Sequence, residues 1–134
     1  MYSLFFDGAS KSNPGLAGCG CVIYDSNDNE IFIDKKYLGS CFSNNYAEYS
    51  GLILGLKLAI TNKIKNIRVY GDSSLVINQM NDVWKIKSNN LIKLFDEAKE
   101  LVKYFDDISF HYIQRKLNSR ADHLANIVLL ENKP

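Results

Sequence analysis

The chain has 134 residues, and its 16 lysines and arginines against 15 aspartates and glutamates leave a formal net charge of +1. The length fits one domain, and 46% hydrophobic residues allow a core that needs neither disulfides nor a structural metal. The sequence contains no run of 18 apolar residues, so no transmembrane helix is predicted. The apolar start before Asp7 lacks the basic region of a signal peptide.

Three β-strands are predicted first, because β-rich runs alternate with turn residues over residues 3–7, 19–24 and 30–37. Asp7-Gly8 is expected to form a turn at the end of the first run. Residues 10–20 are turn-rich around Pro14, and residues 25–29 form a hairpin loop. This order predicts a three-stranded meander.

From residue 45 onwards the hydrophobic spacing changes to the helical period. It predicts a largely buried helix over residues 45–61, a strand over 67–70 and a short helix over 73–80. An amphipathic helix is predicted over residues 89–104, a fifth strand over 108–113 and a last helix over about 119–130. The chain is therefore predicted to be a single α/β domain over residues 1–134, with a five-stranded mixed sheet flanked by helices.

The crossover connections place the fourth strand parallel to the first and at its side. Ligands in such sheets gather at the carboxyl ends of the strands, near the point where the strand order switches. Asp7 at the end of the first strand and Asp72 after the fourth should therefore be neighbours.

Each of four acids at strand ends and helix starts has a purely structural explanation. Asp7 fits the turn, and Asp72 could be the N-cap of the short helix. Glu48 lies three residues after Asn45, as in a capping box, and Asp122 falls in a first helical turn, where the helix dipole favours an acid.

The four acids together predict a metal site. Carboxylates gathered at one edge of a sheet repel one another unless cations neutralise them, and hard divalent cations such as Mg²⁺ suit oxygen ligands. Two such ions about 4 Å apart support in-line attack of water on a phosphodiester. The predicted chemistry is metal-assisted hydrolysis.

Four short blocks contain these acids in a fixed order: Asp7-Gly8-Ala9-Ser10 with Asn13-Pro14-Gly15, Asn44-Asn45-Tyr46-Ala47-Glu48, Tyr70-Gly71-Asp72-Ser73, and Asn118-Ser119-Arg120-Ala121-Asp122-His123-Leu124-Ala125. The blocks and their order resemble the signature of type I ribonuclease H, from residue 3 to about residue 130. The resemblance implies the ribonuclease-H-like fold. It implies an endonuclease that hydrolyses the RNA strand of RNA–DNA hybrids by two-metal-ion catalysis, leaving 5′-phosphate and 3′-hydroxyl ends.

The resemblance also implies a set of site residues. Two Mg²⁺ ions, for which Mn²⁺ could substitute, would be held by Asp7, Glu48, Asp72 and Asp122. The hybrid duplex would contact Gly8, Ser10, Asn13, Ser43, Asn44, Asn45, Trp84, Arg115, Lys116 and Asn118. Helix capping is the alternative role for the two asparagines at 44 and 45, and ordinary packing is the alternative for Trp84.

The chain departs from many bacterial members in two segments. A basic protrusion is missing between the two helices after Asp72, where Lys85 and Lys87 are the only basic residues. The segment 114–117 lacks the histidine that assists catalysis in many members, and His111 and His123 are not well placed to replace it. The compact form resembles the archaeal-type members of the family, and Arg115 or Lys116 could attract the phosphate instead.

Two other functions remain open. A nuclease of this fold could act on double-stranded RNA or branched DNA, or the chain could be an inactive hybrid-binding module, although the four intact acids argue against the latter. A Rossmann-type nucleotide-binding domain is disfavoured, because no G-x-G-x-x-G follows a strand.

The expected setting is a reducing compartment such as the cytoplasm, without membrane association. Cys19 and Cys21 lie in an apolar run and Cys41 is isolated, so reduced thiols are expected. We expect a monomer that needs no protein partner.

The near-neutral charge alone argues against nucleic-acid binding, because such domains are clearly basic as a rule. Residues 63–120, however, hold 11 basic and 7 acidic side chains. Four of the 15 acidic side chains of the whole chain are the predicted metal ligands. With two divalent cations bound, the effective charge becomes about +5. Hybrid binding is therefore predicted to depend on metal and to fall with salt.

Overall fold

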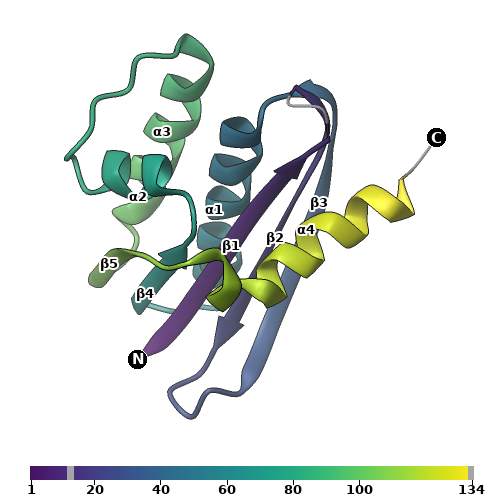
Figure 1. The fold of residues 1–134 in the computed structure, drawn as a ribbon. Helices are drawn as coiled ribbons and strands as arrows, with labels where there is room; N and C mark the ends of the chain where they lie inside the picture. Colours follow the sequence, from purple (N-terminus) through teal and green to yellow (C-terminus); the bar gives the residue numbers. More distant parts are fainter. Residues whose placement is uncertain (12–13, 133–134) are drawn as a thin grey trace.

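The computed structural model describes residues 1–11 and 14–132 and contains one five-stranded sheet with helices on both faces (Figure 1). The strands are β1 (Tyr2–Ser10), β2 (Gly15–Tyr24), β3 (Glu30–Phe42), β4 (Asn66–Gly71) and β5 (Asp107–Tyr112). Their order across the sheet is β3-β2-β1-β4-β5. The pairs β1–β2 and β2–β3 are antiparallel, whereas β1–β4 and β4–β5 are parallel. The predicted mixed sheet is confirmed.

The helices are α1 (Asn44–Thr61), α2 (Ser74–Met80), α3 (Asn89–Val102) and α4 (Ser119–Glu131), with a short 3₁₀ helix η1 (Arg115–Leu117) before α4. All four predicted helices are present within one or two residues of the expected bounds. Within the described ranges, no helix combines the length and apolar character that crossing a lipid bilayer requires.

The two main helices cover opposite faces of the sheet (Figure 1). A Cβ on Gly8 of β1 would collide with the backbone of Ala47 in α1, whereas a Cβ on Gly20 of β2 would lie 2.6 Å from Leu124 in α4. Gly20 pairs with Asp7, the residue next to Gly8, and successive residues of a strand point to opposite faces. Asp7 therefore points to the α4 face, while Gly8 points to α1.

The hydrophobic core lies between α1 and the sheet. Its largest fully buried side chains come from β1, β2, α1 and β4, and include Leu4, Phe6, Ile23, Tyr49, Leu52, Leu56 and Ile67. The prediction of a largely buried first helix is confirmed, because nine of its residues are buried.

The strands extend further than the sequence predicts. β1 continues through Asp7 and Gly8 to Ser10, so the predicted Asp-Gly turn is wrong. The turn-rich segment 10–20 is mostly strand from Gly15 onwards, because its residues pair with β1 as far as Ala17 opposite Ser10. β3 likewise runs to Phe42 rather than ending at Tyr37.

Two helix starts also differ from the predicted caps. Ser43 caps α1, with its side chain accepting a hydrogen bond of 3.1 Å from the Tyr46 N–H, so the predicted capping box of Asn45 and Glu48 is wrong. Ser73 caps α2 by accepting 3.2 Å from the Val76 N–H, so Asp72 is not the cap. Glu48 and Asp72 are therefore available for another role. Asp122 lies in the first turn of α4, as predicted.

Candidate active site

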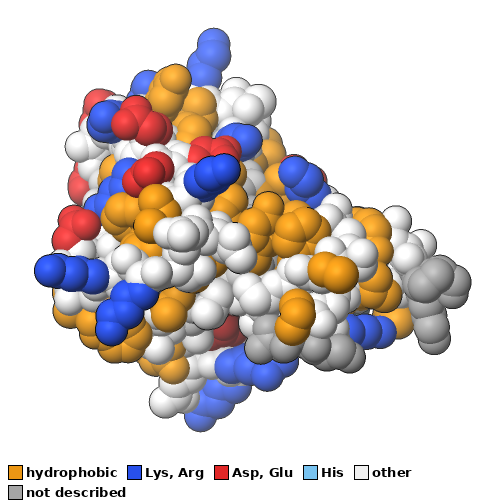
Figure 2. All heavy atoms as spheres, turned by 90° about the horizontal axis from the view of Figure 1, so that it is seen from above, with side chains coloured by type: hydrophobic (Ala, Val, Ile, Leu, Met, Phe, Trp, Pro, Cys, Tyr) orange, Lys and Arg blue, Asp and Glu red, His pale blue; other side chains and the backbone are white. Residues whose placement is uncertain are grey.

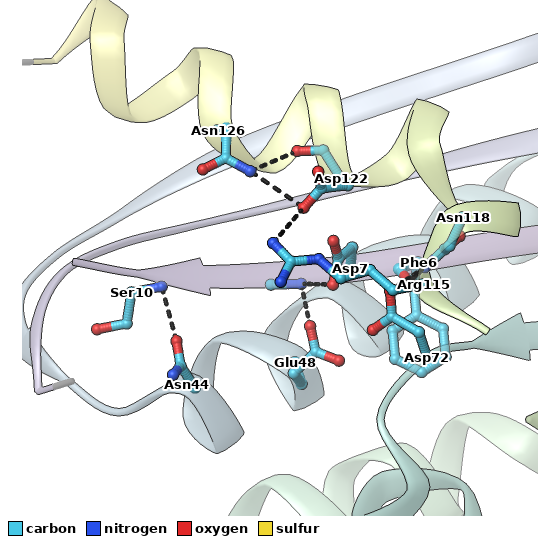
Figure 3. Close-up of polar contacts among 11 residues, drawn as sticks. Phe6, Asp7, Ser10, Asn44, Glu48, Asp72, Arg115, Asn118, Asp122 and Asn126 are labelled. Carbon is cyan, nitrogen blue, oxygen red and sulfur yellow. Dashed lines mark hydrogen bonds and ion pairs between the residues drawn. The ribbon is translucent and has the colours of Figure 1, made fainter. Parts of the chain in front are cut away.

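The site forms where β1 extends beyond the end of its parallel neighbour β4. β1 pairs with β4 only as far as Phe6 opposite Gly71, and Asp7 and Gly8 follow directly. The Gly8 N–H donates to the Asp7 carboxylate at 2.9 Å and to Oε1 of Glu48 (Figure 3). One backbone group thus holds two carboxylates that come from different elements.

Glycines bring α1 close enough for this arrangement. A Cβ on Gly8 would lie 2.1 Å from the carbonyl carbon of Ala47, and a Cβ on Gly51 would lie 2.5 Å from the carbonyl oxygen of Asp7. Neither position tolerates a side chain without separating the two backbones. This close contact places Glu48 beside Asp7.

Three acids converge as a group that could hold a metal ion. Asp7, Glu48 and Asp72 each offer one carboxylate oxygen, and these oxygens lie within 4.8 Å of one another. Asp7 is 4% exposed and Glu48 is 6% exposed. Within the described residues, Oε2 of Glu48 is buried without a hydrogen-bond partner. Divalent cations favour such oxygen-rich, unsatisfied donor sets, so these residues fit a metal.

The protonation behaviour of the group reflects its crowding. Burial raises the pKa of Asp7, and the neighbouring Glu48 and Asp72 raise it further. Burial is also the main cause that raises the pKa of Glu48, to about 7. Burial raises the pKa of Asp72 as well, although the Asn118 hydrogen bond and the Arg115 charge oppose that rise. The raised pKa values mean that these carboxyl groups retain protons, and bound cations could replace those protons.

Asp122 lines the same pocket but lies outside the group of three. Its Oδ1 is 3.6 Å from an Arg115 nitrogen, and Asn126 donates to the same oxygen at 3.1 Å and to the Asp122 carbonyl at 2.8 Å (Figure 3). The pocket has a volume of about 520 Å³. Figure 2 shows acidic atoms within a hollow of the surface, with basic side chains along one side of it.

The pocket brings together five of the predicted substrate contacts: Gly8, Ser10, Asn44, Asn45 and Arg115. Asn44 accepts a hydrogen bond of 2.9 Å from the Ser10 N–H, which ties the end of β1 to the start of α1 (Figure 3).

The other predicted contacts lie elsewhere. Ser43 and Trp84 line two separate grooves, and Lys116 is an exposed residue of η1. Asn118 is 1% exposed and donates to the Phe6 carbonyl at 2.8 Å and to Asp72 at 3.3 Å, so it lies behind Asp72. Asn13 lies outside the described residues.

Sequence reasoning missed Asn126 and Ser73, which also line the pocket. Asn126 follows Asp122 by four residues, which is one helical turn, so its position on the same face could have been predicted from spacing alone. Ser73 follows Asp72 directly in the third of the four blocks, and that adjacency is the signal that places it at the pocket.

Comparison with known proteins decides the family. A sequence profile described as reverse transcriptase-like matches residues 5–128. The crystal structure of ribonuclease H1 from the halophilic archaeon Halobacterium salinarum superimposes with a TM-score of 0.94 at 35% identity, over 97% of this chain and 98% of that one. The chain belongs to the ribonuclease HI family.

Other members of the ribonuclease HI family are similar to it over nearly the whole chain. The N-terminal ribonuclease H domain of a Mycobacterium tuberculosis protein superimposes with a TM-score of 0.93 at 36% identity, over 97% of this chain and 94% of that one. The LC11 ribonuclease H1, solved in complex with an RNA/DNA hybrid, gives 0.88 at 32% identity and 95% coverage of each chain.

Two of the matched relatives are longer proteins. The chain is 38% identical over 120 residues to the mycobacterial protein, which is described as bifunctional, and spans 33% of its length. It is 37% identical over 125 residues to ribonuclease HI of Halobacterium salinarum and spans 62% of that protein. In each case the similarity covers at least 90% of the present chain.

Proposed function

We propose that this ribonuclease HI-family chain is a divalent-metal-dependent endonuclease that cuts the RNA strand of RNA–DNA hybrids and leaves 5′-phosphate and 3′-hydroxyl ends. The observation that carries the proposal is the convergence of Asp7, Glu48 and Asp72, whose oxygens lie within 4.8 Å in a pocket of a ribonuclease H fold. The hybrid bound by the similar LC11 enzyme supports the choice of substrate.

The acids are proposed to hold two Mg²⁺ ions, with Mn²⁺ as a possible substitute. Asp7, Glu48 and Asp72 form the centre of the site, and Asp122 completes it from α4. When bound, such ions activate the attacking water and stabilise the leaving 3′ oxygen. The buried Glu48 Oε2, which is without a partner among the described residues, is the clearest vacant donor for this role.

The remaining residues of the pocket are proposed to bind and orient the hybrid. Asn45 is exposed beside the Ser10–Asn44 contact, where amides and backbone groups can meet the 2′-hydroxyls that distinguish RNA from DNA. Arg115, whose side chain is 80% exposed, is placed to attract the scissile phosphate. Asn118, which lies behind Asp72 and outside the pocket, orients Asp72 through its hydrogen bond.

The broader setting is also a proposal. We infer a single ribonuclease H domain over residues 1–134 that acts as a monomer without an obligatory protein partner, in the cytoplasm or a similar reducing compartment. The free cysteines among the described residues support the reducing setting, because two of the three are buried and none is paired. Light scattering at several protein concentrations tests the monomer.

A substrate panel tests the proposed activity. An RNA–DNA hybrid, duplex RNA, branched DNA and single-stranded RNA of one sequence are incubated with the protein and Mg²⁺, with each strand labelled in turn. We expect cleavage of the RNA strand of the hybrid only, with 5′-phosphate ends on the products. Preferred cleavage of duplex RNA or branched DNA would overturn the substrate assignment, and hybrid binding without any cleavage would identify an inactive module.

A further inference from the structure

The connection between α2 and α3 presents an exposed strip. Trp84 is 48% exposed, and Lys85 and Lys87 are exposed beside it, whereas Ile86 packs against the hydrophobic core. This alternation fixes one apolar anchor between two outward lysines. We call residues Trp84 to Lys87 the Trp84 strip.

The Trp84 strip borders a groove of about 620 Å³ that reaches Asn45 at the start of α1. Asn45 also lines the pocket of the acids, so the groove continues from that pocket. Figure 2 shows basic, acidic and hydrophobic side chains mixed on the side of the molecule where α2 and α3 lie in Figure 1. An apolar ring with flanking lysines fits a nucleic-acid backbone and its sugars.

A buried polar pair lies beneath the strip. Tyr49 of α1 is fully buried and its hydroxyl donates to Oε1 of Gln79 at 2.5 Å. Gln79 of α2 is 4% exposed, and its Nε2 donates to the Lys85 carbonyl at 3.4 Å. The pair therefore connects the centre of the core to the backbone of the strip.

The start of the strip is held by a second contact. The N–H groups of Val83 and Trp84 donate to the Asn78 carbonyl at 2.9 and 3.2 Å. Asn78 and Gln79 are neighbours on α2, so consecutive residues of one helix fix both sides of Trp84. A polar pair in the core is costly unless its hydrogen bonds are made, and here they are made to the strip.

We propose that Gln79, itself oriented by Tyr49, is a positioning residue that holds the Trp84 strip in place as a preformed binding surface. The strip would bind the DNA strand of the hybrid, which pairs with the RNA strand that is cut. The identity of that strand rests on the proposed function. Preorganisation reduces the conformational entropy lost on binding, so it improves substrate affinity and leaves the chemical step unchanged. The compact connection thereby compensates in part for the missing basic protrusion.

Two variants and one spectroscopic probe test the proposal. Gln79→Met keeps the side-chain length but removes both hydrogen bonds, and Tyr49→Phe removes only the hydroxyl that orients Gln79. Trp84 is the only tryptophan of the chain, so its fluorescence reports on the strip alone. Tyr104→Phe is the matched control, because Tyr104 is 57% exposed and lies away from the strip.

We expect both variants to fold and to show lower Trp84 anisotropy and stronger quenching by acrylamide. Tyr49→Phe should raise KM for the hybrid by about 3- to 10-fold, the effect of one lost hydrogen bond, and Gln79→Met, which loses two, by at least as much. The value of kcat should stay within about 2-fold, since only uniform binding is removed. Tyr104→Phe should change none of these quantities.

Unchanged Trp84 anisotropy, quenching and KM in the folded variants would overturn the proposal, as would a fall in kcat at constant KM. Failure of the wild-type protein to cut hybrids would refute the proposed function instead. The fluorescence of the variants would still decide whether Gln79 holds the strip, because it does not depend on catalysis.

Discussion

Asp7 and Glu48 occupy positions that are unfavourable for two negative charges. Both side chains are buried, and the Gly8 N–H is shared between them. Because a buried charge without a partner is strongly destabilising, the metal-free pair retains protons to a higher pH than ordinary carboxyl groups. The buried acids that can bind cations therefore lower the stability of the metal-free folded protein.

This arrangement predicts that Asp7→Asn stabilises the metal-free protein at alkaline pH. The folded-state pKa of Asp7 lies above its ordinary value of 3.8, and that of Glu48 is raised from 4.5 to about 7. Such groups contribute their full stabilisation below the unfolded pKa, near pH 4, and lose it as the pH rises through the folded pKa. The neutral amide avoids this loss.

Thermal unfolding in a chelator at pH 5 and pH 8 measures the effect. Asp7→Asn should raise Tm at pH 8 by several degrees, since about 2 kcal/mol corresponds to roughly 6 °C in a domain of this size, and by less at pH 5. Added Mg²⁺ should raise Tm of the wild type and not of the variant. The exposed Asp106→Asn is the control; a lower Tm for Asp7→Asn than for this control at pH 8 would contradict the account.

At the scale of elements, the contact between α1 and β1 depends on the absence of side chains. Alanine is a better helix former than glycine by about 1 kcal/mol, so helix propensity alone predicts that Gly51→Ala stabilises α1. A Cβ there would lie 2.5 Å from the Asp7 carbonyl oxygen, so helix and strand must separate. We expect Gly51→Ala to destabilise the protein by about 3 kcal/mol, against its helix propensity.

Urea unfolding measures that change in the free energy of unfolding. Ser50→Ala is the matched neighbour on α1. The Ser50 hydroxyl donates to the Tyr46 carbonyl of the same helix at 2.8 Å, and its loss should change stability by less than about 0.5 kcal/mol. If Gly51→Ala were as stable as the wild type, the close contact would not be what places Glu48 beside Asp7.

Periodicity in the sequence predicts the elements, but not where they meet. The 3.6-residue spacing gives α1 within one residue, and the order of strands and helices gives the neighbouring positions of β1 and β4. The Asp7-Gly8 pair misleads, because glycine serves a turn and a tight backbone contact equally well. Only the three-dimensional position of Ala47 shows which of the two roles Gly8 has.

The helix starts show the same limit for the site. Ser43, Asn44 and Asn45 are three consecutive residues that all make good N-caps, so the sequence alone cannot say which one begins α1. The structure gives that role to Ser43, which leaves the two asparagines at the pocket. The convergence of Asp7, Glu48 and Asp72 was predictable, because each lies at a strand end or helix start of the predicted topology.

For the whole molecule, the net charge of +1 combines an acidic pocket with basic side chains elsewhere. Neutralisation of the pocket by cations leaves a basic protein, so hybrid binding should weaken as salt rises. We predict that Lys85→Ala/Lys87→Ala reduces the slope of log K against log salt by about 2, because each lysine lost removes roughly one phosphate contact.

Fluorescence anisotropy of a labelled hybrid between 50 and 200 mM salt, with Ca²⁺ in place of Mg²⁺ to prevent cleavage, measures that slope. The control Lys65→Ala/Lys103→Ala removes the same charge away from the groove, where Lys65 donates to the Tyr104 carbonyl at 3.2 Å and Lys103 pairs with Glu100 at 2.9 Å. Equal slopes for the two double variants would show that net charge, rather than the Trp84 strip, governs binding.

The rate of hybrid cleavage in Asp72→Asn shows whether the converging acids hold the cations that drive hydrolysis. The wild type and Asp106→Asn should cut the RNA strand with Mg²⁺ and not with a chelator, and Asp72→Asn should be slower by at least about 100-fold. Equal rates for Asp72→Asn and the wild type, or cleavage that persists in the chelator, would contradict the account.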